Sequence, residues 1–104
     1  MVRKQFLEKI IELKKKDLKL ARAFIIKAKS SSPRNVGTEM LITENGDTFG
    51  TIGGGADEKT IREKAVYLIK EQRSEKIKLS LTRQEAADIG WVCGGEIEVF
   101  IQII

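Results

Sequence analysis

The spacing of apolar residues changes several times along the chain and divides it into helical and extended segments. Residues 3–16 repeat apolar side chains at intervals of three and four, which predicts an amphipathic helix. Its apolar face is expected to contain Phe6, Ile10 and Leu13. Residues 18–28 instead contain a continuous apolar run from Ala23 to Ile26, which is typical of a central strand covered on both faces.

A hairpin and a second helix follow. Residues 38–43 and 48–52 have the composition of strands, and Asn45-Gly46 between them favours a type I′ turn. After a run of glycines, the pattern predicts a helix that ends near Gln72. Its buried stripe is expected to contain Ile61, Ala65, Leu68 and Ile69.

Two more strands are expected near the end of the chain. Residues 76–81 and 96–104 both alternate apolar and polar side chains, as half-buried strands do. Between them, Thr82 and Glu85 form a capping box that would open a short helical turn, and Gly90 would stop it.

These segments predict one α/β (α+β) domain that spans residues 1–104. We expect two layers, in which two long helices cover one mixed sheet of about five strands, in the order α-β-β-β-α-β-β. No apolar run approaches the ~20 residues that cross a bilayer, and no secretory leader is recognisable. One cysteine excludes an internal disulfide, so we expect a cytoplasmic protein.

Charge changes this picture little. The net charge is +4, with +7 on residues 1–29 and −3 on the remainder. A basic flank can attract nucleic acid, but the chain has only six aromatic residues and no RNA-binding signature. A solvated helix face explains the lysines, so we expect neither nucleic acid nor membrane as a partner. The chain has no histidine, which removes the commonest general base and metal ligand.

The segment Thr48–Glu58, TFGTIGGGADE, has the clearest chemical potential. Three glycines lie between a strand and a helix start, where free amide groups and the helix dipole favour an anion such as phosphate. The spacing is neither that of a P-loop nor G-x-G-x-x-G. A tight β-to-α connection without a ligand explains the glycines equally well.

Other candidate residues lie in two further predicted loops and at the start of the second helix. Arg34 could fork onto a phosphate or serve as a solvated loop cation, and Ser31 and Ser32 could donate to an anion or only form turns. Cys93, before Gly94 and Gly95, could be a thiolate or a small buried hydrophobe. Glu58 could act as a base or ligand anchor, or only complement the helix dipole. If the segments 30–37, 53–57 and 91–95 meet in space, they form a pocket rich in N–H and hydroxyl donors.

Several of these motifs together resemble the XdhC/CoxI family, the accessory factors of xanthine dehydrogenase and related molybdenum hydroxylases. The order and spacing fit across nearly the whole chain. The matching pieces are Ser-Ser-Pro-Arg at 31–34, Gly37, Met40, Asn45-Gly46, Gly50, Gly53–Gly55, Glu58 and Cys93-Gly94-Gly95.

The resemblance implies a non-catalytic factor that binds molybdenum cofactor (molybdopterin) as cargo. Such a factor assists the sulfuration of the cofactor or its insertion into a molybdenum hydroxylase such as xanthine dehydrogenase. It further implies that Ser31, Ser32, Arg34, Glu58 and the glycines hold the cofactor, and that Cys93 lies near the molybdenum or its sulfur. The binding glycines are Gly53, Gly54, Gly55, Gly94 and Gly95.

The chain departs from the family in two ways. It resembles the N-terminal domain alone, without the Rossmann-like second domain, so we expect a separately encoded Rossmann-domain partner. We also expect the accessory factor to be a homodimer. Many relatives have Cys where this chain has Ala56, and Gly where it has Ser30. Two readings stay open beside the accessory factor. One is an enzyme or subunit acting on a phosphorylated or nucleotide-bearing small molecule at the glycine-rich loop, and the other is an interaction domain with a degenerate pocket.

Overall fold

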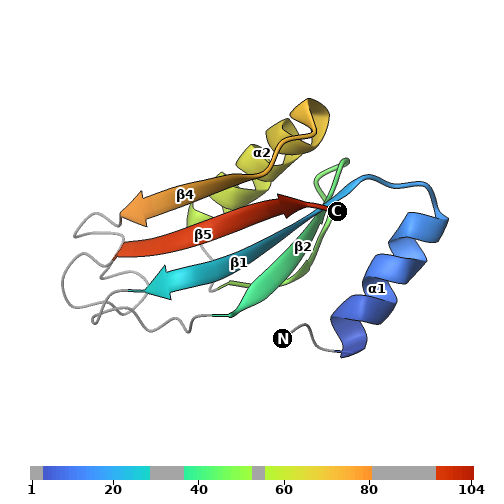
Figure 1. The fold of residues 1–104 in the computed structure, drawn as a ribbon, viewed down its shortest axis with the longest axis horizontal. Coiled ribbons are helices and arrows are strands. Elements are labelled where there is room, and N and C mark those ends of the chain that lie inside the picture. Colours follow the sequence, from blue (N-terminus) through green and yellow to red (C-terminus); the bar gives the residue numbers. More distant parts are fainter. Residues whose placement is uncertain (1–3, 29–36, 53–55, 81–95) are drawn as a thin grey trace.

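The computed structural model describes residues 4–28, 37–52, 56–80 and 96–104 of the chain. Its elements are α1 (Lys4–Lys15), β1 (Leu20–Ala28), β2 (Glu39–Thr43), β3 (Thr48–Gly50), α2 (Ala56–Glu71), β4 (Glu75–Ser80) and β5 (Glu96–Ile103). This order confirms the predicted α-β-β-β-α-β-β succession (Figure 1). The expected helical turn at 82–90 lies outside the described residues. Within those residues, no helix is both long and apolar enough to span a bilayer.

One sheet of five strands, in the order β3-β2-β1-β5-β4, forms the centre of the α+β fold. Every neighbouring pair is antiparallel, so the prediction of a mixed sheet was wrong. The β3-α2-β4 connection does join two strands of the same direction, as helical crossovers commonly do. However, β3 and β4 occupy opposite edges of the sheet, with three strands between them, and never pair.

The core lies between α2 and one face of the sheet. The α2 stripe predicted from the sequence, Ile61, Ala65, Leu68 and Ile69, is fully buried. It packs against alternate residues of the three central strands, because successive strand side chains point to opposite faces. These strand residues are Ala21, Ala23, Ile25, Met40, Ile42, Ile97, Val99 and Ile101.

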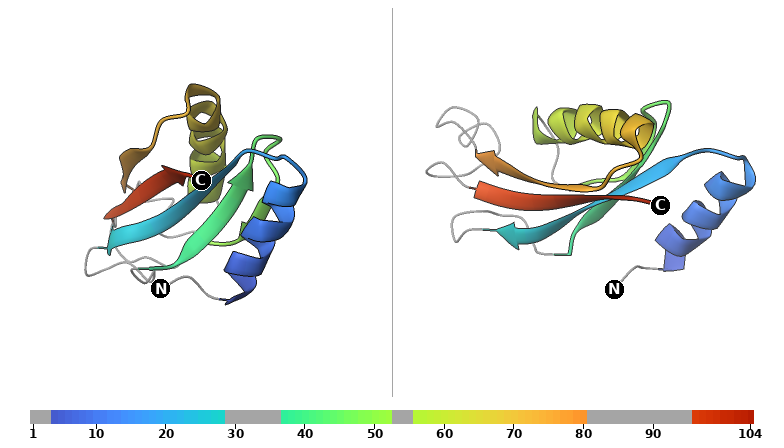
Figure 2. Two further views of the ribbon diagram at one scale, coloured as in Figure 1. Left: turned by 45° about the vertical axis from the view of Figure 1, so that its right-hand side comes forward. Right: turned by 45° about the horizontal axis from the view of Figure 1, so that its top comes forward.

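The opposite face carries α1, which lies over the β2–β3 end of the sheet (Figure 2). Phe6 is 1% exposed and meets Phe49 of β3 edge-on, with ring centroids 5.2 Å apart. Leu13 reaches the face formed by Leu41. The helices therefore lie on different faces of the sheet, and the expected two-layer arrangement becomes three layers where α1 crosses.

The central strand β1 is covered less completely than its apolar run predicted. On the face opposite α2, Arg22 and Phe24 are only half-buried. The Arg22 guanidinium lies 4.1 Å from the Phe24 ring centroid and pairs with the Glu39 carboxylate, which is 3% exposed. Phe24 also contacts Phe100 of β5, with ring centroids 5.8 Å apart.

The β2–β3 hairpin is confirmed, but its turn is not the predicted type I′. That type requires a positive φ at both central residues, and here Gly46 has φ +86° whereas Asn45 does not have a positive φ. The Gly46 amide donates to the Thr43 carbonyl, and the Thr43 amide donates to the Asp47 carbonyl. The Thr43 hydroxyl oxygen accepts from the amides of Asn45 and Asp47, which stabilises this three-residue loop.

Candidate functional site

Glu58 is the predicted site residue whose position the structure describes. The other predicted residues lie outside the described ranges, and their roles stay predictions. They are Ser31, Ser32, Arg34, Gly53, Gly54, Gly55, Cys93, Gly94 and Gly95.

The described residues that border the three predicted loops can be compared. Ala28 ends β1 beside the first residues of β5, and β4 ends at Ser80 directly opposite Glu96. The flanks of segments 29–36 and 81–95 thus lie side by side at one end of the sheet (Figure 1). β3 ends at Gly50, which lies level with Ala23 in the middle of β1. At the usual rise per residue of a strand, Gly50 is about 16 Å from that end of the sheet. The expected meeting of all three loops stays a prediction.

Glu58 belongs to the first turn of α2, where a carboxylate complements the helix dipole. Its side chain accepts a hydrogen bond from the Thr51 hydroxyl, with an oxygen–oxygen distance of 2.5 Å. Thr51 precedes the glycine run and Glu58 follows it, so this bond connects the end of the hairpin with the start of α2. The carboxylate is therefore held at the edge of the glycine segment and is half-buried there.

A polar cavity of about 270 Å³ lies beside Glu58 on the α2 side of the hairpin. Its lining residues come from β2, β3 and α2, and they are Met40, Thr48, Glu58, Lys59 and Arg62. Lys59 and Arg62 are exposed and outweigh the single charge of Glu58. Since ligand pockets usually measure ~300–1,000 Å³, this cavity suits one end of a ligand and not a whole large cofactor.

The charge and geometry of this cavity suit an anionic group. The Arg62 guanidinium offers planar paired donors that match a phosphate, and the Lys59 ammonium adds a point charge. Both lie in the first half of α2, whose N-terminal dipole also favours an anion. Within the described ranges, no cluster of three or more carboxylate or thiol side chains is placed to hold a metal ion. The described residues thus fit the phosphate end of a cofactor, and the predicted metal contact depends on Cys93.

Sequence reasoning selected Glu58 as a candidate, but it did not select Thr48, Lys59 or Arg62, which line the cavity beside it. A usable signal was present, because Glu58 and Arg62 are four residues apart and therefore share one face of a helix. Lys59 gave no signal, since an exposed helical lysine has no distinctive pattern. Met40 appeared among the family-like motifs, and the structure places it fully buried in the wall of this cavity.

Comparison with known proteins identifies the family. Residues 13–81 match the model of the XdhC and CoxI family, and the chain belongs to that family. The chain is 30% identical over 92 residues to the Escherichia coli K12 protein YqeB, described as uncharacterized, covering 88% of this chain and 17% of YqeB.

A solved structure gives a similar result. It is described as a xanthine dehydrogenase from Bacillus halodurans at 2.80 Å resolution. The two structures superpose with a TM-score of 0.73 at 29% identity, over 93% of this chain and 30% of that one. The chain therefore spans less than a third of either relative.

Proposed function

We propose that this chain is an accessory factor that binds molybdenum cofactor and assists its sulfuration or its insertion into a xanthine dehydrogenase-type enzyme. Family membership, with the likeness to the Bacillus halodurans chain, suggests an accessory role connected with xanthine dehydrogenase. The finer proposal rests on one observation: the cationic cavity of Lys59 and Arg62 borders the Glu58–Thr51 bridge across the glycine segment.

In this proposal the cofactor is cargo, and each part of the site binds one part of it. Arg62 and Lys59 would bind the phosphate tail through charge-assisted hydrogen bonds. Glu58, held by Thr51, would accept a hydrogen bond from an N–H group of the pterin. Cys93 would lie near the molybdenum, because thiolate is a soft ligand for a transition metal.

The proposal is tested by titrating the purified protein with isolated molybdenum cofactor and measuring bound pterin and molybdenum. Arg62→Gln should weaken binding about tenfold, the lower limit for a lost hydrogen bond to a charged group. Lys59→Gln should weaken it less, because it removes a point charge near solvent. Lys70→Gln, an exposed lysine in the last turn of the same helix, is the matched control and should leave binding unchanged.

Three results would contradict this proposal. They are a wild-type protein that retains no cofactor, two cavity variants that both bind as well as wild type, and a control that weakens binding equally. Arg34→Ala and Cys93→Ser extend the test to predicted residues outside the described ranges. Turnover of a phosphorylated compound without molybdenum would favour the enzyme reading, because the same cations bind any phosphate.

The assembly is also a proposal. We expect a homodimer that works with a molybdenum hydroxylase and with a separately encoded Rossmann-domain partner. Light scattering after size exclusion measures the mass of the 11.7 kDa chain in solution directly. A monomeric mass would contradict the homodimer without affecting the proposed cofactor site.

A further inference from the structure

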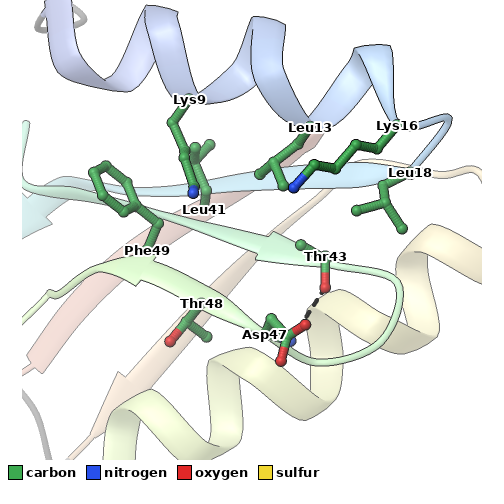
Figure 3. A pocket seen from close by; sticks show the side chains of 9 residues that line it. All are labelled: Lys9, Leu13, Lys16, Leu18, Leu41, Thr43, Asp47, Thr48 and Phe49. Carbon is green, nitrogen blue, oxygen red and sulfur yellow. Dashed lines mark hydrogen bonds between the residues drawn. The ribbon is translucent and has the colours of Figure 1, made fainter.

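A second cavity lies on the other face of the sheet, between α1 and the β2–β3 hairpin (Figure 3). It measures about 240 Å³. Its lining residues are Lys9, Leu13, Lys16, Leu18, Leu41, Thr43, Asp47, Thr48 and Phe49. Thr48 lines both cavities, but the charged side chains proposed to bind the cofactor, Glu58, Lys59 and Arg62, do not line this one.

The floor of this cavity is apolar. Leu13 of α1 and Leu41 of β2 are buried, and Leu18 and Phe49 are half-buried. Leu41 and Phe49 are register partners on neighbouring strands, so their side chains lie next to each other on one face. A ligand with a short apolar body would gain affinity by covering this surface.

The helix side of the cavity is cationic. Lys9, Leu13 and Lys16 follow one another at i, i+4 and i+7, which places them on one face of α1 and its extension. Figure 3 shows the two lysine side chains directed toward the apolar floor from opposite ends. The Lys9 ammonium lies 5.7 Å from the Phe49 ring centroid. With Asp47 at the hairpin end, the described lining carries two positive charges and one negative.

A carboxylate of the protein itself already pairs with both lysines. Glu12 lies 3.1 Å from the Lys9 ammonium and 4.0 Å from that of Lys16. The hydrogen bond from Lys9 is the main cause that lowers the pKa of Glu12, with a smaller contribution from the charge of Lys16. The exposed Glu12 therefore shows which chemistry the two ammonium groups accept, and an incoming carboxylate would compete with it.

We propose that this cavity binds a small amphipathic carboxylate, with its anionic group between Lys9 and Lys16 and its apolar body over Leu41 and Phe49. A cation would meet two ammonium groups, and a neutral molecule would leave them to Glu12. The volume fits a body of one ring or a short chain. This site differs from the proposed cofactor site, because the latter is polar and lies on the α2 face of the hairpin.

The test uses 3-phenylpropionate, an aromatic carboxylate of about eleven non-hydrogen atoms, and 3-phenylpropanol, its uncharged counterpart. Amide NMR of the full chain should show shifts in the second half of α1 and in the hairpin, with a Kd on the order of millimolar for a ligand this small. The alcohol should bind at least threefold more weakly, and added salt should reduce the difference.

Variants separate the roles of the charges. Lys9→Met and Lys16→Met should each weaken binding of the carboxylate roughly threefold, as for exposed ion pairs. Glu12→Gln should strengthen it by a similar factor, because both ammonium groups lose their competing partner. The matched control is Lys15→Met, an exposed lysine that does not line the cavity, and it should change nothing.

The Glu12 variant gives the sharpest result, because a merely structural role for Glu12 cannot increase affinity. The proposal is overturned if the alcohol binds as tightly as the carboxylate, if Glu12→Gln weakens binding, or if Lys15→Met matches the cavity variants. It is also overturned if 3-phenylpropionate shifts only amides of α2. None of these outcomes depends on whether molybdenum cofactor binds.

Discussion

The Phe6 ring of α1 packs directly over the backbone of Gly50, and we expect Gly50→Ala to be the most informative single change in the fold. This last residue of β3 has φ +87°, which non-glycine residues rarely adopt. A Cβ atom at Gly50 would lie 2.6 Å from Cζ of Phe6 and 3.0 Å from the Glu39 carbonyl oxygen. Phe6 is 1% exposed, so its ring has little room to move away.

The expected cost has two parts. The left-handed backbone costs an alanine about 1–2 kcal/mol, and overpacking a buried contact adds about 1–3 kcal/mol, giving about 2–5 kcal/mol in all. Gly46→Ala is the matched control. It has nearly the same φ, +86°, but a Cβ there would meet nothing within 4 Å. That variant should therefore lose only the backbone part, about 1–2 kcal/mol.

The measurement is the free energy of unfolding from urea titrations followed by far-ultraviolet circular dichroism. Adding Phe6→Leu to Gly50→Ala removes the Cζ atom that would clash, so the double variant should be more stable than the sum of the two single effects. Equal losses for Gly46→Ala and Gly50→Ala, together with additive effects of Phe6→Leu, would refute the described packing of α1 on β3.

Two further predictions concern charged pairs. Glu75 accepts hydrogen bonds from Lys64 and Arg73, each at 2.8 Å, and these bonds, that from Lys64 first, lower its pKa. The ion pairs of Glu75 therefore stabilise the fold at neutral pH, and this contribution is lost as pH falls through the lowered pKa. Glu75→Gln should accordingly lose less stability than wild type between about pH 7 and pH 3, measured as urea midpoints. Wild-type and variant midpoints that fall in parallel with pH would contradict this. Arg22→Leu should lower the free energy of unfolding in urea by about 3–5 kcal/mol, because it leaves the buried Glu39 carboxylate unpaired. Adding Glu39→Gln should recover part of this loss. A cost below about 1 kcal/mol would disprove that dependence.

Local periodicity was sufficient to predict the helices and strands that the structure describes. The α2 stripe is buried, and the inward alternation of Ile97, Val99 and Ile101 in β5 is confirmed. The pattern of α1 was ambiguous, because Leu7 and Ile11 are as apolar as Phe6 but are 50% and 55% exposed. Periodicity identifies an apolar stripe, whereas its width depends on how far the helix overlaps the sheet.

Strand order could not be predicted from the sequence. β5 lies between β1 and β4, and nothing in the alternation of its residues distinguishes this place from an edge. The prediction of a mixed sheet failed for the same reason, because β3 and β4 run in the same direction but would form a parallel pair only if they were neighbours. For the candidate site, the acidic first turn of α2 marked Glu58, but the Thr51 hydrogen bond and the cations Lys59 and Arg62 depend on the hairpin lying against the helix.

The pairing of β1 with β5 has a consequence for how the chain acquires its structure. Ala21 pairs with Ile103, so the centre of the sheet joins residues from nearly the first and last parts of the sequence. Contacts so distant along the chain have a large loop-closure entropy, and folding slows as such contacts come to dominate. During synthesis, the β1–β2–β3 meander can form early, but the cooperative unit is complete only after β5 leaves the ribosome.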